Sequence, residues 1–138
     1  MKALVPVLLM LVGLAGRAAA ADSAVKPDVY KAPDQLARLI ADQSQPYLLV
    51  DVRTPEEYAS GHIPTAINDP VTDIGAKPPT PEKAALIIVY CRSGARSARA
   101  REILVGMGYA SVVDFGSVAR WTGRLVTGDQ PTAKAATP

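Results

Sequence analysis

Two short apolar runs constrain the fold of this chain more than any other feature of its sequence. They are YLLVDV, from Tyr47 to Val52, and AALIIVYC, from Ala84 to Cys91. Both are rich in branched apolar residues and lack the polar alternation of a half-exposed strand. Runs of this kind are typical of strands buried on both faces, as in a parallel sheet. A weaker third run, ASVVDF from Ala110 to Phe115, predicts another strand.

Helical patterns occupy the segments between these runs. Pro33 to Gln43 places Pro in the first turn and leucines at helical spacing, and Thr54 to Gly61 begins with a capping box. A third helix is expected from Ser97 to Gly106 or Gly108, and one short turn from Gly116 to Trp121. Alternating strands and helices predict an α/β fold, with a central parallel sheet and helices on both faces.

The amino-terminal segment predicts export. It carries Lys2, an apolar run from Ala3 to Ala15, and small residues up to Ala21, which is typical of a cleaved signal peptide. The run is short for a membrane span, which needs roughly 20 apolar residues. We therefore expect a signal peptide at residues 1–21 and a periplasmic or secreted protein without stable membrane association; an uncleaved signal acting as an anchor is the alternative.

The remaining length fits one domain. We expect a lead-in at residues 22–30, a domain at 31–126, and a flexible tail at 127–138, which is small, polar and contains Pro. Loss of Lys2 and Arg17 with the signal leaves 13 of the 15 basic residues, against 13 acidic ones. This balance gives no reason to expect a nucleic-acid partner.

The chain has a single cysteine, Cys91, at the end of an apolar run. It is either a buried structural thiol or a reactive one. With one Cys and one His, no metal site of the usual Cys/His kind is expected. Because the carboxyl ends of strands carry the active sites of parallel α/β proteins, Cys91 is a candidate catalytic residue.

The loop after Cys91 predicts an anion-binding site. Small residues at Ser93, Gly94 and Ala95 allow the backbone to curl, so that its N–H groups and the start of the next helix face the sulfur. Arg92 and Arg96 would attract anionic substrates. Lowering a thiol pKa by about two units raises the thiolate fraction roughly 25-fold, but lower nucleophilicity removes roughly 6- to 10-fold of that gain. The loop therefore gains more by stabilising a larger anion bound to the sulfur than by lowering the thiol pKa.

The loop CRSGARS, preceded by LLVDVRTPEEYASGHIPTAIN, resembles the rhodanese (thiosulfate sulfurtransferase) domain family. The similarity extends from about Pro33 to Val126, and the short exported form is similar to single-domain periplasmic rhodaneses. The resemblance implies a rhodanese-like sheet and a two-step sulfur transfer, in which Cys91 takes sulfane sulfur from thiosulfate or a similar donor. An acceptor such as cyanide, a small thiol or a protein thiol would then attack the persulfide, with no cofactor. The implied substrate-binding residues are Arg92, Ser93, Gly94, Ala95, Arg96 and Ser97.

Other residues of the motif have simpler interpretations. We expect Asp51 and Arg53 to pair within the scaffold, His62 to fix a loop, and Trp121 to pack in the core or at its rim. Three departures from the family pattern affect the rim: Thr65 where Gly is frequent, Gly116-Ser117 where a Gly pair is frequent, and a shortened ending, WTGRLV, without Pro.

Three other functions are alternatives to sulfur transfer. A cysteine phosphatase needs Cys-x5-Arg, whereas here the sixth position after Cys91 is Ser97 and the last Arg of the loop is Arg96. A non-catalytic or sulfur-carrier domain that binds a partner is a second alternative, although relatives of that kind commonly lack the cysteine. A thiol sensor is the third, and a lone thiol without a resolving partner suits it poorly.

Overall fold

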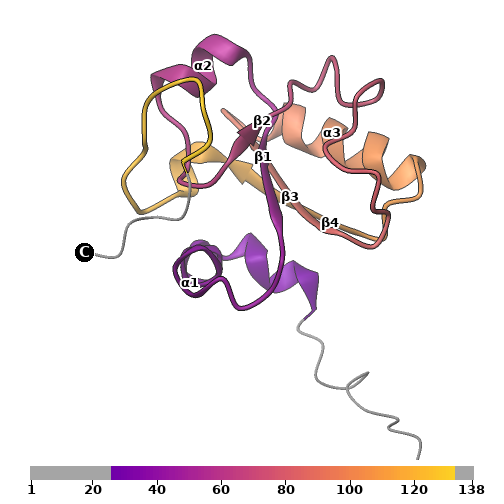
Figure 1. Ribbon diagram of the computed structural model, residues 1–138, viewed down its shortest axis with the longest axis horizontal. Helices are drawn as coiled ribbons and strands as arrows, with labels where there is room; N and C mark the ends of the chain where they lie inside the picture. Colours follow the sequence, from indigo (N-terminus) through magenta and orange to yellow (C-terminus); the bar gives the residue numbers. More distant parts are fainter. Residues whose placement is uncertain (1–25, 133–138) are drawn as a thin grey trace, which may run out of the picture.

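The computed structural model describes residues 26–132, and within this range it contains a four-stranded parallel sheet (Figure 1). The strands are β1 (Leu48–Asp51), β2 (Ile67–Asn68), β3 (Leu86–Cys91) and β4 (Ser111–Ser117), in the order β2-β1-β3-β4. Every neighbouring pair is parallel. The α/β prediction is therefore confirmed. The proposed signal peptide lies outside the described residues.

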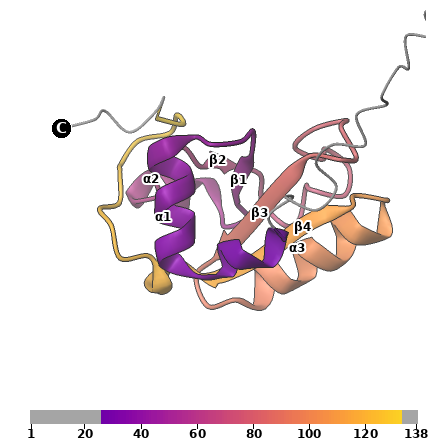
Figure 2. The same cartoon turned by 90° about the horizontal axis from the view of Figure 1, so that it is seen from below.

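The three α-helices are α1 (Pro33–Asp42), α2 (Pro55–Ser60) and α3 (Ala95–Gly106), with short 3-10 helices η1 (Pro27–Lys31) and η2 (Val118–Arg120). Helices α1 and α3 lie on opposite faces of the sheet, and Figure 2 shows α1 in front of it. Helix α2 begins with the expected capping box between Thr54 and Glu57. No helix among residues 26–132 is long and apolar enough to cross a membrane.

The sheet separates two apolar clusters, because successive strand residues point to opposite faces. The α1 side contains Leu36, Leu39, Ile40, Leu49, Tyr58, Ile88, Tyr90, Val113 and Phe115. The α3 side contains Val50, Ile87, Val89, Cys91, Ala100, Leu104 and Val112. All six residues of β3 are buried, as its apolar sequence indicated. Cys91 thus points to the α3 side of the sheet.

Two local expectations need correction. The helix after the cysteine begins at Ala95, not at Ser97, because Gly94 adopts a left-handed conformation (φ 102°) and turns the chain into the helix two residues early. The sequence also gave no indication of β2, whose two half-buried residues carry too little apolar pattern to read as a strand. The other strands and helices lie within about two residues of their expected ends.

Both ends of the described chain pack against the domain. Tyr30 of η1, in the expected lead-in, is buried in the α1-side cluster. Near the other end, His62 and Val126 form an antiparallel bridge, and the N–H of Gly128 donates to the carbonyl of Ala59 at 2.9 Å. Figure 1 shows this last segment, in yellow, beside α2. It covers the loop that leads into β2.

Candidate active site

Cys91 is the last residue of β3, and its thiol is enclosed by the turn that leads into α3. The N–H of Gly94 donates to the Cys91 Sγ at 2.9 Å, and the Ser97 Oγ lies 3.6 Å from the same sulfur. Cys91 is fully buried, so one side of the thiol contacts the apolar cluster under α3 while the other faces these polar groups. The Gly94 amide therefore points at the sulfur.

The surroundings of the thiol lower its pKa. Burial alone acts to raise the pKa of Cys91, but hydrogen bonds from the Ser97 hydroxyl and from the N–H groups of Ser97, Gly94 and Ser93 outweigh it. The net pKa lies below the ordinary thiol value. A sulfur that accepts hydrogen bonds from several donors is suited to carry negative charge.

The Ser97 hydroxyl can serve the thiol in both protonation states. Its Oγ lies 3.0 Å from the Gly94 carbonyl, to which it donates, so it can accept the Cys91 S–H. When the thiol ionises, rotation of the hydroxyl hydrogen lets it donate to the sulfur instead. The sequence predicted Ser97 as part of the site and as the start of the helix; in the structure it lies in the first turn of α3, which begins at Ala95.

Gly94 gives the loop its shape. Its φ of 102° lies in the left-handed region, which residues with a Cβ rarely adopt. This turn directs the Gly94 N–H at the sulfur and starts α3 without any side-chain cap. Arg92, Ser93 and Ala95 are exposed around the turn, and of these three the N–H of Ser93 also forms a hydrogen bond with the thiol.

Arg96 is at the rim, but its guanidinium faces an acidic neighbour. Its Nη1 and Nη2 donate to the two carboxylate oxygens of Glu57, at 2.7 and 3.0 Å. The sequence predicted Glu57 only as the capping-box partner of Thr54, which it also is. A phosphatase would need a loop arginine turned inward on its anion, and Arg96 pairs outward with α2 instead. The pairing was missed because the two residues lie 39 positions apart.

Ser117, which the sequence marked only as a departure from the family pattern, also supports the loop. In β4 one extra residue interrupts the register, since Val89 pairs with Asp114 but Tyr90 pairs with Gly116. This β-bulge brings Ser117 opposite Cys91, and the Ser117 Oγ donates to the Arg92 carbonyl at 2.5 Å. The serine found where the family often has Gly therefore supports the first residue of the loop.

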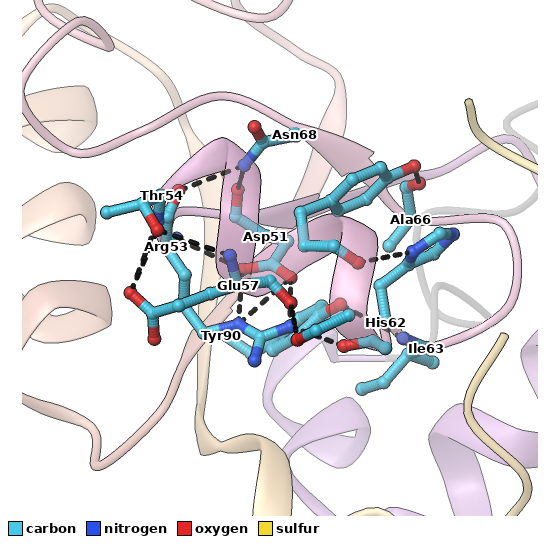
Figure 3. A network of polar contacts seen from close by, with 12 residues as sticks. Asp51, Arg53, Thr54, Glu57, His62, Ile63, Ala66, Asn68 and Tyr90 are labelled. Atoms are coloured by element: carbon cyan, nitrogen blue, oxygen red, sulfur yellow. Dashed lines mark hydrogen bonds and ion pairs between the residues drawn. The ribbon is translucent and has the colours of Figure 1, made fainter. Parts of the chain in front are cut away.

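A buried polar network lies at the end of β1, at the same edge of the sheet (Figure 3). Arg53 pairs with Asp51 at 2.6 Å, with both side chains almost fully buried, and Arg53 Nη2 also donates to the Gly61 carbonyl at 2.7 Å. Burial acts to lower the pKa of Arg53, but its hydrogen bond and ion pair with Asp51 raise it above the ordinary value. Asn68 donates to the carbonyls of Asp51 and Arg53. The expected scaffold pair is confirmed.

His62 and Tyr90 also belong to the scaffold. The His62 ring is fully buried, stacks on Tyr58 with centroids 3.8 Å apart, and its Nδ1 lies 2.9 Å from the Tyr58 carbonyl. The Tyr90 hydroxyl accepts from the N–H of Ile63 at 3.0 Å. These contacts fix the loop between α2 and β2, as expected for His62. Trp121 is half-buried against the α1-side cluster, in agreement with its expected packing role.

One groove of the described residues lies away from the thiol loop. A groove of about 410 Å³, lined by Gln43, Tyr47, Thr65 and their neighbours, is at the amino ends of the strands, and none of its residues belongs to the Cys91 loop. Among residues 26–132 no group of three or more His, Cys, Asp and Glu side chains is placed to hold a metal ion. The thiol loop is therefore the best-supported candidate site.

Together, a parallel α/β sheet and a thiol held by backbone N–H groups at a strand end define a class of protein that performs nucleophilic sulfur chemistry. Comparison with known proteins identifies the family within this class. Residues 32–123 match the family described as Rhodanese-like domain. The chain belongs to this family of rhodanese-like sulfurtransferases.

Individual relatives agree with this assignment. The chain is 38% identical over 89 residues to a sulfurtransferase of Allochromatium vinosum, covering 64% of this chain and 82% of that protein. It is 39% identical over 71 residues to the thiosulfate sulfurtransferase PspE of Escherichia coli, covering 50% and 68%. Among solved structures, the fold matches a rhodanese with anions from E. coli with a TM-score of 0.55 and 34% identity, covering 59% of this chain and 99% of the other.

Proposed function

We propose that this protein is a thiosulfate sulfurtransferase that carries sulfur on Cys91 as a persulfide. The Cys91 thiolate attacks the outer sulfur of thiosulfate or a similar sulfane donor; the donor S–S bond breaks, and sulfite leaves with its electron pair. An acceptor such as cyanide, a small thiol or a protein thiol then attacks the outer sulfur of the persulfide. Cys91 leaves as the thiolate, and the cycle closes.

The observation that carries this proposal is the set of N–H and O–H donors around the Cys91 sulfur. The Gly94 N–H and the Ser97 hydroxyl lie within hydrogen-bonding distance of it. The same donors that lower the thiol pKa can stabilise the terminal negative charge of a persulfide. Thiosulfate as donor is supported by the similarity to PspE, whose name includes that substrate. No step of this cycle calls for a metal or an organic cofactor.

Intact-protein mass spectrometry tests the proposal. After incubation with thiosulfate and removal of excess donor, we expect the wild-type protein to gain the mass of one sulfur atom and to lose it on addition of cyanide. The Cys91→Ser variant, with a smaller and far less acidic nucleophile, should gain nothing and should lose at least about 10³-fold in thiocyanate formation. Sulfur addition to Cys91→Ser, or none to the wild type, would refute the persulfide mechanism.

Export is a separate part of the proposal. The apolar run and small residues before Asp22 support cleavage near Ala21 and a periplasmic or secreted location. Amino-terminal sequencing of the protein from an exporting host is expected to begin at Ala21 or Asp22. Recovery of the full-length chain in the membrane fraction would favour the anchor alternative instead.

A further inference from the structure

The ion pair between Glu57 and Arg96 lies at the rim of the thiol loop, and it does not take part in the apolar core. Its side chains are 29% and 34% exposed, in contrast to the buried Asp51–Arg53 pair. Exposed pairs contribute little to stability. We therefore ask how this bidentate pair changes the electrostatic potential at the thiol.

Glu57 is held in its position by α2. Its Oε1 accepts from the Thr54 N–H at 3.4 Å and from the Thr54 hydroxyl at 3.3 Å, while both oxygens accept from Arg96. The hydrogen bond from Arg96 lowers the pKa of Glu57 to about 2, so the carboxylate is charged at any physiological pH. The negative charge is thus fixed beside the loop.

Arg96 lies close enough to Cys91 for their charges to interact. Its pKa is raised, first by the hydrogen bond to Glu57 against an opposing effect of burial, and further by the charges of Glu57 and Cys91. Arg96 is the second residue of α3, directly after the turn that encloses the sulfur. Without Glu57, its full positive charge would act on the sulfur and on any anion that approaches it.

We propose that Glu57 is a specificity-determining residue that reduces the preference of the site for highly charged anionic donors by neutralising Arg96. The inference rests on the proposed sulfur transfer and names the substrate property that the rim selects. A doubly charged donor such as thiosulfate loses twice as much electrostatic attraction when the positive potential falls as a singly charged donor such as an alkanethiosulfonate anion. Glu57 thereby shifts the site toward less charged donors.

The Glu57→Gln variant tests this role. Gln retains an oxygen for the capping box and removes the charge, so the freed Arg96 should strengthen binding of anions. We expect the KM to fall roughly threefold for methanethiosulfonate and roughly ninefold for thiosulfate, because the electrostatic free energy scales with donor charge. Equal factors for the two donors, or an unchanged or higher KM for thiosulfate, would overturn the inference.

Glu56→Gln is the matched control. Glu56 precedes Glu57 in the same helix, is exposed, and has no ion pair among the described residues. Its neutralisation changes the net charge by the same amount at a position farther from the guanidinium. It should change either KM less than about twofold. An effect as large as that of Glu57→Gln would mean that net charge, not the pair with Arg96, governs donor preference.

Alkylation of Cys91 provides a readout that does not depend on sulfur transfer. Iodoacetate is an anion and iodoacetamide is neutral, while both react with the thiolate, so the ratio of their rates reports the local potential independently of the thiol pKa. We expect this ratio to rise roughly threefold in Glu57→Gln, to fall by a similar factor in Arg96→Gln, and to return to the wild-type value in the double variant.

These outcomes separate the two proposals. If the wild type takes sulfur from neither donor, the proposed function fails while the alkylation ratios still decide the role of Glu57. Unchanged ratios in both single variants would refute that role even in an active enzyme. The opposite sign expected for Arg96→Gln keeps the inference falsifiable if Glu57→Gln does not fold.

Discussion

Two polar regions lie at the carboxyl edge of the sheet, and they differ in how their charged groups are neutralised. At the end of β1, Asp51 and Arg53 form a buried ion pair whose remaining hydrogen bonds go to the backbone. At the end of β3, the Cys91 sulfur is surrounded by N–H and O–H donors. The first region cancels its charges internally. The second is prepared for a negative charge, which is the property of a reaction site.

The difference shows how to separate scaffold from site in this fold. Both regions are buried and both contain ionisable groups, so burial does not distinguish them. What distinguishes them is whether the donors already have a fully charged partner. The substitutions below are expected to affect stability in one region and sulfur chemistry in the other.

Asp51→Asn should have the largest effect, and on stability. It leaves the buried Arg53 guanidinium without its counter-ion, which typically costs about 3–5 kcal/mol. Urea denaturation should show this loss in the free energy of unfolding, whereas alkylation of Cys91 in the folded variant should keep its wild-type pH midpoint. Asp42→Asn, at the exposed end of α1, is the control and should change stability by less than about 0.5 kcal/mol. A loss of less than about 1 kcal/mol in the free energy of unfolding of Asp51→Asn would show that the pair does not stabilise the fold.

Gly94→Ala should affect both properties. A Cβ at φ 102° costs roughly 1–2 kcal/mol, and relief of that strain would rotate the Gly94 N–H away from the Cys91 sulfur. We expect a stability loss of about that size together with at least a tenfold loss of sulfur transfer. Gly106→Ala is the control, because nothing lies within 4 Å of the added Cβ and its φ is not left-handed. Full activity in Gly94→Ala would show that the turn is not needed in its present shape.

Ser97→Ala should act on the thiol alone. Removal of the hydroxyl takes away a hydrogen bond that lowers the pKa of Cys91, so this pKa should rise. The pH midpoint of iodoacetamide alkylation would then move upward. Because a depressed thiol pKa stabilises the folded state only as pH rises through it, the wild type should gain stability over the variant toward alkaline pH. A midpoint that stays or falls would exclude the hydroxyl as a donor to the thiolate.

The elements that could be predicted from sequence are those specified by local pattern. Strand β3 was recognisable because its burial on both faces requires a continuous apolar run, from Leu86 to Cys91. The start of α2 was recognisable because Thr54 and Glu57 form a capping box within one turn. The position of the thiol at a strand end followed from these elements. The proposed anion-binding loop was recognisable because the small residues Ser93, Gly94 and Ala95 follow the cysteine closely.

The features that were missed depend on contacts between distant segments. Ser117 meets Arg92 only because an extra residue in β4 shifts the register. Glu57 meets Arg96 only because α2 and α3 begin at the same edge of the sheet. The wrong start of α3 has a different cause: a serine is a frequent helix cap, but Gly94 in the left-handed conformation needs no side chain to begin the helix.

The bulge in β4 makes the register of that strand matter for the thiol loop. Without the bulge, a regular ladder would pair Tyr90 with Phe115 and Cys91 with Gly116, and Ser117 would lie one position farther along with its side chain on the opposite face of the sheet. Ser117 would then no longer reach the Arg92 carbonyl, although every residue around Cys91 would still be present in the sequence. The position of Ser117 beside the loop therefore depends on where β4 takes up its extra residue, and not only on which residues follow Cys91.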